Sequence, residues 1–387
     1  MSNANSVSLA YVAEATYGVI PSGPPTLQAL EFTSESFKRN AVYKKSQLIR
    51  SDRQVPGTIL VDANGDGGFS TEFRYGALDD FLKAAIQSSA WSSPNTDTIT
   101  CSLASGDNSI NRASGDFTSD GYAAGQWIRV SGFSTNGAIF YCKIVTAAAL
   151  KLTVTGITLT NESATSVELE GGGYVVNGTT QPSFYIERQF TDLTNKFSQH
   201  TGQVVNTLTL GVSVENIVTV DIGMLGKPEA AATATAGTGS NTAASTNPIM
   251  NAVTNVDAVL ENGSEFSIRS LTLTVSNNLR ERKEVATLGA TSIGAGSLSV
   301  TGNITLYYGD SAHSVYAKYL ADTVTKLAIR FIDNSGNAYV IDLPTMKYTQ
   351  ANRNATAIDT DVEIPLTFEA TLDATELKTM RVVRWAV

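Results

Sequence analysis

The chain has 387 residues, of which 42% are hydrophobic and only 16% are charged, and its formal charge is −9. This length predicts two or three domains with substantial cores. The acidic balance and the lack of a basic stripe argue against tight binding to nucleic-acid phosphates. No apolar run approaches the roughly 20 residues that span a bilayer, and the N-terminal residues show no signal-peptide pattern. We therefore expect a protein that folds in the cytoplasm without membrane insertion.

Alternating apolar and polar residues predict β-strands along most of the chain. The first clear example, "FSTEFRY" (69–75), places Phe69 and Phe73 on one face. The next run, "ALDDFLKAAIQSS" (77–89), repeats its apolar residues at helical spacing and carries two acids that suit a helix N-terminus. We expect a strand followed at once by an amphipathic helix.

Residues 96–178 interrupt this unit before its next strand, "SFYIERQF" (183–190). They contain short strand candidates separated by Gly, Asn and Ser turns, which predicts a separate small β domain. We expect this domain to face outward and to be dispensable for assembly, because insertions succeed at exposed loops. Its two cysteines, Cys101 and Cys142, are too few for a disulfide scaffold, and we expect them as buried thiols.

The low-complexity segment 229–261 predicts a linker, and a second copy of the strand–helix unit follows it. Here "NITLYYG" (303–309) precedes the amphipathic run "SAHSVYAKYLADTV" (311–324). A charged segment that ends in Gly comes before the strand and helix in both copies, at 46–57 and at 276–289. The repeated order predicts a duplication.

Sequence patterns that would indicate catalysis or metal binding are incomplete. "DANGDG" (62–67) matches the first half of a calcium loop, but Phe73 stands where the bidentate acid is required, so we expect a Gly-rich β-turn. Asp79 and Asp80 are adjacent, so they diverge by roughly 100° on a helix and cannot flank one substrate bond. His313 is expected on an exposed helix face. We expect no enzyme activity, no catalytic residues, no metal and no cofactor.

Four segments carry a resemblance to a known family: "YVAEATYGVIPSGP", "SDRQVPG", "FSTEFRYGALDDFLKAA" and "GSLSVTGNITLYYGD". They are similar to the tail tube, or major tail, proteins of long-tailed bacteriophages, and the resemblance covers about 9–91 and 181–387. It implies a mainly β fold with two tandem tube domains, each a β-sandwich or barrel with one α-helix. It also implies that the inserted β domain is immunoglobulin-like.

With this resemblance, the chain divides into five parts. Residues 1–95 form the N-terminal part of the first tube domain, 96–178 the inserted β domain, 179–228 the remainder of the first tube domain, 229–261 an Ala/Thr/Ser-rich linker, and 262–387 the second tube domain.

The resemblance also implies a function. Members of the family place six units in a ring and stack the rings into a conduit for DNA. A chain with two units then implies three chains per ring, a homotrimer with pseudo-hexameric symmetry. The implied partners are copies of the chain itself, the tape measure protein, and the tail terminator and tail tip proteins. Phage DNA is expected to pass through the lumen without specific binding, and the protein is expected in the virion after assembly in the host cytoplasm.

In the resembled family, an extended loop and the chain termini bridge neighbouring rings. We therefore expect ring-to-ring contacts from the N-terminal arm (2–25) and from the charged loops 44–57 and 279–289. A dense cluster of charge marks these loops in a chain that has few charges. The candidate interface residues are Arg50, Asp52, Arg53, Arg280, Glu281, Arg282 and Lys283.

Two alternatives remain open on the sequence. One is a tube component of a bacterial contractile secretion system, which shares the fold. The other is a receptor-binding or glycan-binding tail protein, in which Trp127, Tyr122 and Phe133 of the inserted domain stack on sugars.

Overall fold

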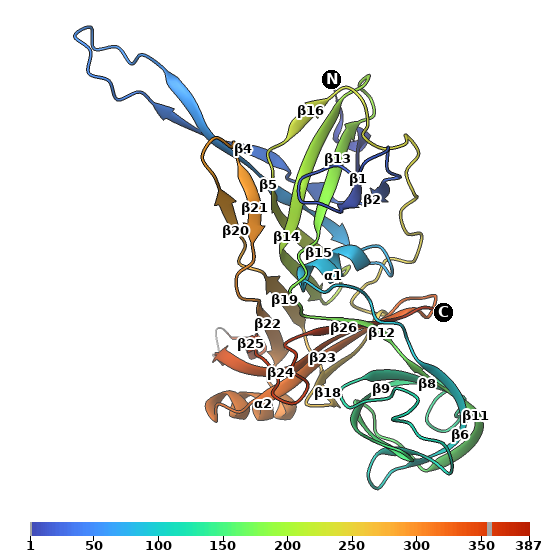
Figure 1. Ribbon diagram of the computed structural model, residues 1–387. Coiled ribbons are helices and arrows are strands. Elements are labelled where there is room, and N and C mark those ends of the chain that lie inside the picture. The colour runs from blue at the N-terminus through green and yellow to red at the C-terminus, as the bar shows by residue number, and fades with distance from the viewer. Residues whose placement is uncertain (1, 354–357) are drawn as a thin grey trace.

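The computed structural model describes residues 2–353 and 358–387. Strands make up 51% of the protein, and two α-helices, α1 and α2, lie in the described residues. The prediction of a mainly β fold is confirmed. Two sheet-and-helix units lie next to each other, and a small β domain packs against the second of them (Figure 1). Neither helix in the described parts of the chain is long and apolar enough to cross a membrane.

The first unit contains helix α1 (Asp79–Ala85) and pairs its strands in the order β1–β13–β14–β15–β5–β4. Its strands are β1 (Val7–Glu14), β2 (Gln28–Leu30), β3 (Ser34–Glu35), β4 (Lys38–Lys45), β5 (Thr58–Glu72), β13 (Ser183–Phe190), β14 (Phe197–Ser213), β15 (Thr219–Gly226) and β16 (Ala230–Ala232). Phe81 of α1 is fully buried, and its ring centroid lies 4.7 Å from that of Tyr11 and 5.1 Å from that of Phe69. The predicted helix is confirmed, because its apolar stripe covers the sheet.

The second unit repeats this pairing as β17–β23–β24–β25–β22–β19. Its elements are α2 (Asp310–Leu320), β17 (Val256–Glu261), β18 (Ser264–Glu265), β19 (Ser270–Ser276), β20 (Arg280–Lys283), β21 (Ala290–Gly294), β22 (Ser299–Tyr307), β23 (Thr325–Ile332), β24 (Ala338–Ala351), β25 (Glu363–Ala370) and β26 (Arg381–Trp385). β17 falls inside the expected linker 229–261, so the second unit begins earlier in the chain than the low-complexity composition indicates.

The two units share one sheet. β14 of the first unit pairs antiparallel with β19 of the second, from Thr207 opposite Ser276 to Ser213 opposite Ser270. β22 continues the ladder on the far side of β19, and β25 continues it further. Backbone hydrogen bonds therefore cross the boundary between the units without interruption.

The inserted domain is a closed barrel rather than the expected immunoglobulin-like domain. Its six strands follow the order β10-β7-β6-β11-β8-β9. They are β6 (Thr96–Ala104), β7 (Ser109–Arg112), β8 (Trp127–Ser131), β9 (Ile139–Ala148), β10 (Lys151–Thr155) and β11 (Glu162–Gly171). Register shifts between β9 and β10 and between β6 and β11 place an extra residue in β9 and in β11, and such bulges bend the strands and help a short sheet to close on itself. Cys101 and Cys142 are free thiols in the barrel core, and burial raises the pKa of Cys101 to about 12.

The end of the expected insert belongs to another part of the molecule. β12 (Gly173–Val176) lies within 96–178 but pairs with β26 of the second unit. The N-terminal segment also differs from the expected arm, because β1 joins the sheet and buries Leu9 and Tyr11 in the core. Both segments contain enough apolar residues to join a sheet. Their pairing with strands distant in sequence, rather than their neighbours along the chain, decides where they lie.

The "DANGDG" segment is the middle of strand β5, and the prediction of a β-turn is wrong. Its glycines serve close approach of neighbouring backbones. A Cβ atom on Gly65 would lie 2.1 Å from the Lys227 carbonyl oxygen, and one on Gly68 would lie 1.9 Å from that of Ile222. The described residues contain no group of His, Cys, Asp and Glu that could hold a metal ion.

His200 of β14 is a buried histidine in the first unit. It packs on the ring of Phe37, with the centroids 5.2 Å apart, and its Nε2 atom has no hydrogen-bond partner. Burial lowers the pKa of His200 to about 4, although Glu229 acts in the opposite direction. Arg188 lowers the pKa further and forms ion pairs with Glu35 and Glu229.

This burial predicts an acid-sensitive first unit. Between pH 6.5 and about 4 the unfolded chain binds a proton that folded His200 does not, so the free energy of unfolding decreases as the pH falls. We expect a loss of the order of 2 kcal/mol over this range. Denaturant unfolding at a series of pH values should show that His200→Asn removes this loss. His313→Asn, at an exposed histidine, should retain it. An unchanged pH dependence in His200→Asn would assign the loss to other groups, such as Glu229, whose pKa is lowered.

Candidate functional site

The first candidate surface is the polar face of the shared sheet. Side chains alternate along β14 and β19, so Leu208 and Leu273 lie in the core while Thr209 and Thr274 lie on the opposite face. The Oγ1 atoms of Thr209 and Thr274 are 3.2 Å apart across the boundary between the units. The residues that share this face are mostly small and uncharged: Ser70, Thr207, Thr209, Gly211, Ser213, Thr219, Gly223, Ser270, Thr272, Thr274, Ser276, Ser299, Thr301, Asn303, Thr305 and Thr367.

Most charged groups on this face are acidic. The strand register places Glu72, Asp221, Glu363 and Glu369 on it, with Lys347 opposite Glu369. Ser70 donates a hydrogen bond to Asp221, and Glu363 forms an ion pair with Arg269. The sequence showed an acidic overall charge, but only the strand register identifies the acids that lie on this face.

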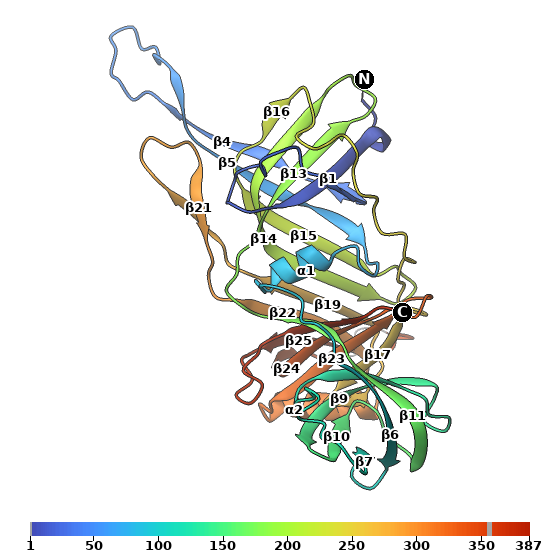
Figure 2. The same ribbon diagram turned by 45° about the vertical axis from the view of Figure 1, so that its right-hand side comes forward.

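The second candidate surface is a pair of β-hairpins. The long hairpin consists of β4, β5 and their connecting loop 46–57, and it projects far beyond the body of the molecule (Figure 1). The short hairpin consists of β20, β21 and loop 284–289, and it lies on the same side in both views (Figures 1 and 2). Both occur at the same point in their units, because the long hairpin connects β4 to β5 and the short hairpin connects the corresponding strands β19 and β22.

The predicted interface residues divide between these hairpins. Arg50, Asp52 and Arg53 lie at the tip of the long hairpin. There Arg50 Nη2 is 2.6 Å from Asp52 Oδ2, and the hydrogen bond from Arg50 lowers the pKa of Asp52. Arg53 has a positive φ of 59° and closes the tip by donating its backbone N–H to the Arg50 carbonyl. The tip is therefore shaped by its own side chains.

The remaining four residues, Arg280 to Lys283, form β20. Lys283 pairs with Asp62 of β5, which raises the pKa of Lys283 and lowers that of Asp62. Glu281 accepts a hydrogen bond from Asn64 of β5. The structure thus brings Glu281 and Lys283 to the base of the long hairpin, while Arg50, Asp52 and Arg53 stay at its tip.

Sequence reasoning missed the apolar residues of the hairpins. Ile49 and Val285 are fully exposed at the two tips, at 102% and 99%. Other exposed apolar side chains on the same hairpins are Val42, Tyr43, Leu48, Val55, Ile59, Val61 and Leu288. Clusters of exposed apolar residues on soluble proteins mark interaction sites. The signal was present in "SQLIRSDRQVPG", whose apolar residues have no place in a buried strand pattern.

A family model described as phage tail tube protein matches residues 4–370. The chain belongs to the phage tail tube protein family. No curated protein sequence matches it. Family membership makes the protein a structural component of the phage tail that assembles with itself into a tube, and this family is not a class of enzymes.

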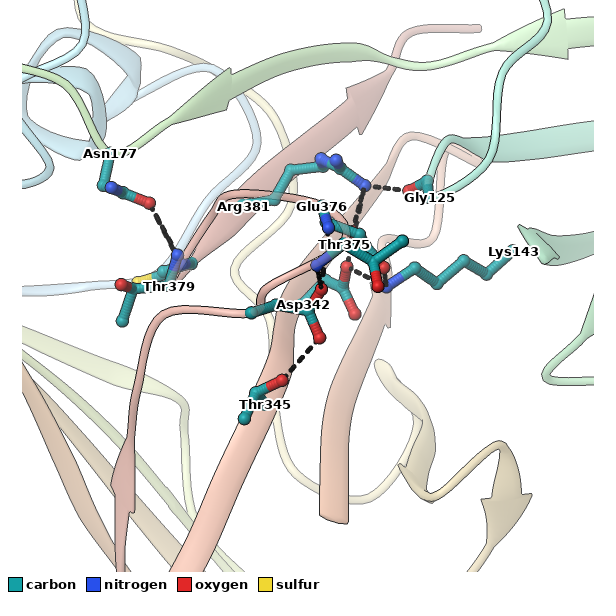
Figure 3. A network of polar contacts seen from close by, with 11 residues as sticks. Gly125, Lys143, Asn177, Asp342, Thr345, Thr375, Glu376, Thr379 and Arg381 are labelled. Atoms are coloured by element: carbon teal, nitrogen blue, oxygen red, sulfur yellow. Dashed lines mark hydrogen bonds and ion pairs between the residues drawn. The ribbon is translucent and has the colours of Figure 1, made fainter. Parts of the chain in front are cut away.

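In this tail tube protein the inserted barrel is fixed to the second unit by a buried ion-pair network (Figure 3). Lys143 of the barrel reaches Asp342 Oδ2 at 2.8 Å and Glu376 Oε1 at 2.7 Å. Arg381 Nη1 lies 3.3 Å from Glu376 Oε2 and donates a hydrogen bond to the carbonyl of Gly125 in the inserted domain. Every charge in the network has an opposite charge beside it, as burial requires.

Aromatic packing surrounds this network. Trp127 and Tyr141 of the barrel join Trp385 and Val340 of the second unit in one buried cluster. The Trp385 indole donates a hydrogen bond to the Glu170 carbonyl at 3.1 Å. An interface of this kind holds two domains in a fixed arrangement. The expectation of a dispensable domain therefore conflicts with the packing, because deletion would expose this cluster and leave the carboxylates of Asp342 and Glu376 without Lys143.

Breaking the network from the barrel side should destabilise the tube protein. Lys143→Met leaves two buried carboxylates with Arg381 alone, and we expect a loss of about 3–5 kcal/mol in the free energy of unfolding. Lys151→Met is the matched control, because it breaks the exposed pair with Asp107 in the same barrel and should cost under about 1 kcal/mol. Denaturant titration measures both. Equal, small losses would show that the network does not hold the barrel.

Proposed function

We propose that three copies of the chain close into a ring of six units, and that stacked rings form the conduit for phage DNA. The observation that carries this proposal is the β14–β19 ladder, which joins two units of equal pairing pattern edge to edge within one chain. Repeating such a joint around an axis closes the sheet and removes its open edges, which would otherwise favour aggregation. Half of the joints in the ring are then covalently linked.

The polar face of the shared sheet forms the wall of the lumen in this proposal. The opposite face is packed against the helices, so the polar face is the one that the fold leaves free for solvent and DNA. Hydroxyl groups and acids such as Glu72 and Glu369 make up most of this face, and its lysines Lys38 and Lys347 lie opposite the acids Asp66 and Glu369. The net negative charge keeps the duplex away from the wall. DNA passes through without specific binding.

The two hairpins make the contacts between stacked rings. Their exposed apolar residues are buried against the next ring, and their charged residues supply polar contacts around this apolar area. The long hairpin extends beyond its own unit, so its tip reaches the next ring.

We further propose that the tube meets the tape measure protein in its lumen and the tail terminator and tip proteins at its ends, and that it assembles in the host cytoplasm.

Neither alternative gains support from a specific contact. A glycan-binding inserted domain would present its aromatic residues to solvent, whereas Trp127, Tyr122 and Phe133 are all buried. The shared sheet suits a tube of either a phage or a secretion system, and family membership favours the phage tail.

Charge added to the lumen should slow the passage of DNA. Thr272→Lys and Asn303→Lys each place a cation on the polar face, repeated in every chain of every ring. We expect tubes of normal length, with slower genome ejection from phage that carry the variants. Asn303→Asp is the control of similar size and should eject DNA at the normal rate. Equal ejection rates for Lys and Asp variants would place this face outside the lumen.

Polar substitution of the hairpin tip should prevent stacking. Leu48→Asp together with Ile49→Asp removes two exposed apolar side chains and should leave the subunit folded but shorten or abolish tubes in negative-stain micrographs. Arg50→Glu with Arg53→Glu should weaken stacking mainly at low salt, because exposed ion pairs are screened.

The exposed residue Leu150 on the inserted barrel provides the control for these variants. Leu150→Asp should form tubes of normal length. Normal tubes from the Leu48/Ile49 variant would show that the long hairpin is not the ring-to-ring contact.

A further inference from the structure

The shared sheet has two unpartnered edges, one in each unit. In the described residues β4 pairs only with β5, and the part of β24 after Thr349 pairs only with β25. Lys38, Gln350 and Asn352 on these edges are exposed. In the repeated pattern β24 is the counterpart of β14, and β4 is the counterpart of β19. Inside the chain, β14 and β19 pair with each other.

β14 and β24 align residue by residue because each contains one extra residue at the same point. Asn206 is skipped in the pairing of β14 with β15, and Thr349 is skipped in the pairing of β24 with β25. On this alignment Thr207 corresponds to Gln350 and Thr209 to Asn352.

β19 and β4 align through the strands beside them. Met224 and Phe368 are equivalent, because each pairs with the residue directly before the skipped one. Met224 also pairs with Gly67 in the first unit, and Phe368 pairs with Gly302 in the second. The neighbouring residues Asp66 and Thr301 are therefore equivalent. Asp66 lies opposite Lys38 and Thr301 lies opposite Thr274, so Lys38 corresponds to Thr274. Two residues further along, Asn40 corresponds to Ser276.

We propose that β24 of one chain pairs antiparallel with β4 of the next chain, with Gln350 opposite Asn40 and Asn352 opposite Lys38. These pairs copy Thr207 opposite Ser276 and Thr209 opposite Thr274 inside the chain. The inference rests on the proposed ring and identifies its joint between chains. The partner is a second copy of this protein, held by main-chain hydrogen bonds.

Side-chain directions beyond the end of β24 agree with this register. Arg353 corresponds to Leu210, whose side chain points to the helix side of the sheet. Arg353 points to the helix side as well, with its guanidinium 4.4 Å from the ring centroid of Tyr316 in α2. The strand alternation therefore continues through residue 353, and the backbone edge of 350–353 remains available for pairing.

Each unit has a groove at the corresponding place. The first unit supplies one wall of the groove in the second unit, but the groove in the first unit has no such wall. In the second unit a groove of about 540 Å³ lies between β17, the segment before β19 and the end of β14. The corresponding groove in the first unit, between β1 and the segment before β4, is larger, at about 810 Å³, and is lined by that unit alone. The end of β24 from the next chain would supply the missing wall.

Cysteine cross-linking in assembled protein tests the register. Lys38→Cys with Asn352→Cys should form an interchain disulfide on mild oxidation, because directly opposed residues bring their Cβ atoms within disulfide range. Non-reducing gels should show covalent dimers and trimers, with the closed trimer as the end point and no larger species. The native Cys101 and Cys142 are buried and should not contribute.

Two matched variants complete the experiment. Thr209→Cys with Thr274→Cys repeats the same pair inside one chain and should lose two free thiols without changing its oligomer size on the gel. Lys38→Cys with Gln350→Cys is out of register by two residues and should cross-link at least tenfold more slowly.

The outcomes distinguish failure of the proposed strand register from failure of the proposed ring. Tubes that form while the in-register pair fails to cross-link, or cross-links no faster than the shifted pair, would overturn the register and leave the tube function standing. Ladders beyond the trimer would place the contact outside a three-chain ring. Absence of both tubes and cross-links would contradict the proposed function as well.

Discussion

The β14–β19 ladder is the interaction on which the rest of the architecture depends. A sheet edge presents unpaired N–H and C=O groups, and water or another strand must satisfy them. Here one unit satisfies the edge of the other through seven successive residue pairs, from Thr207 opposite Ser276 to Ser213 opposite Ser270. The same ladder fixes which side chains face the core, because a slip of one residue would exchange Leu208 with Thr209. This strand pairing both stabilises the contact between the two units and fixes their register.

The other parts of the molecule follow from that joint. The hairpins leave the shared sheet at equivalent points in the two units, and the contacts of Lys283 and Glu281 with β5 brace the short hairpin against the long one. Glycines in β5 let its backbone approach β15 closely, which keeps the ladder continuous below the projecting tip. The inserted barrel lies at the other end and stiffens the second unit through Lys143 and the Trp127 cluster. Rigid units with a fixed joint suit a tube whose geometry is repeated many times.

Much of this fold could be predicted from the sequence because its patterns are local. Alternation in 69–75 and helical spacing in 77–89 correspond to β5 and α1, and the order of elements indicated the second unit. The barrel, the place of β12 and the strand conformation of "DANGDG" were not predictable in this way. Each depends on contacts between residues distant in sequence, such as β12 with β26 and Gly68 with Ile222. Local glycine content favours a turn, and only the neighbouring strand shows why the glycines are needed.

The candidate site was predicted in part, and for a similar reason. Charge density marked the loops that hold Arg50 and Lys283, but it gave no sign of the difference between tip and base. The polar face was hidden among many Ser and Thr residues until the strand register assembled it. Exposed apolar residues such as Ile49 became informative only after the fold showed that nothing in the chain covers them.

The number of chains in one ring tests the central claim most directly. Native mass spectrometry of rings released from purified tubes should give the mass of three chains of 40.9 kDa each. That result follows if both units of each chain take part in the ring through equivalent strand joints. A ring of six chains would contradict the account, because the second unit would then lie outside the wall of the tube.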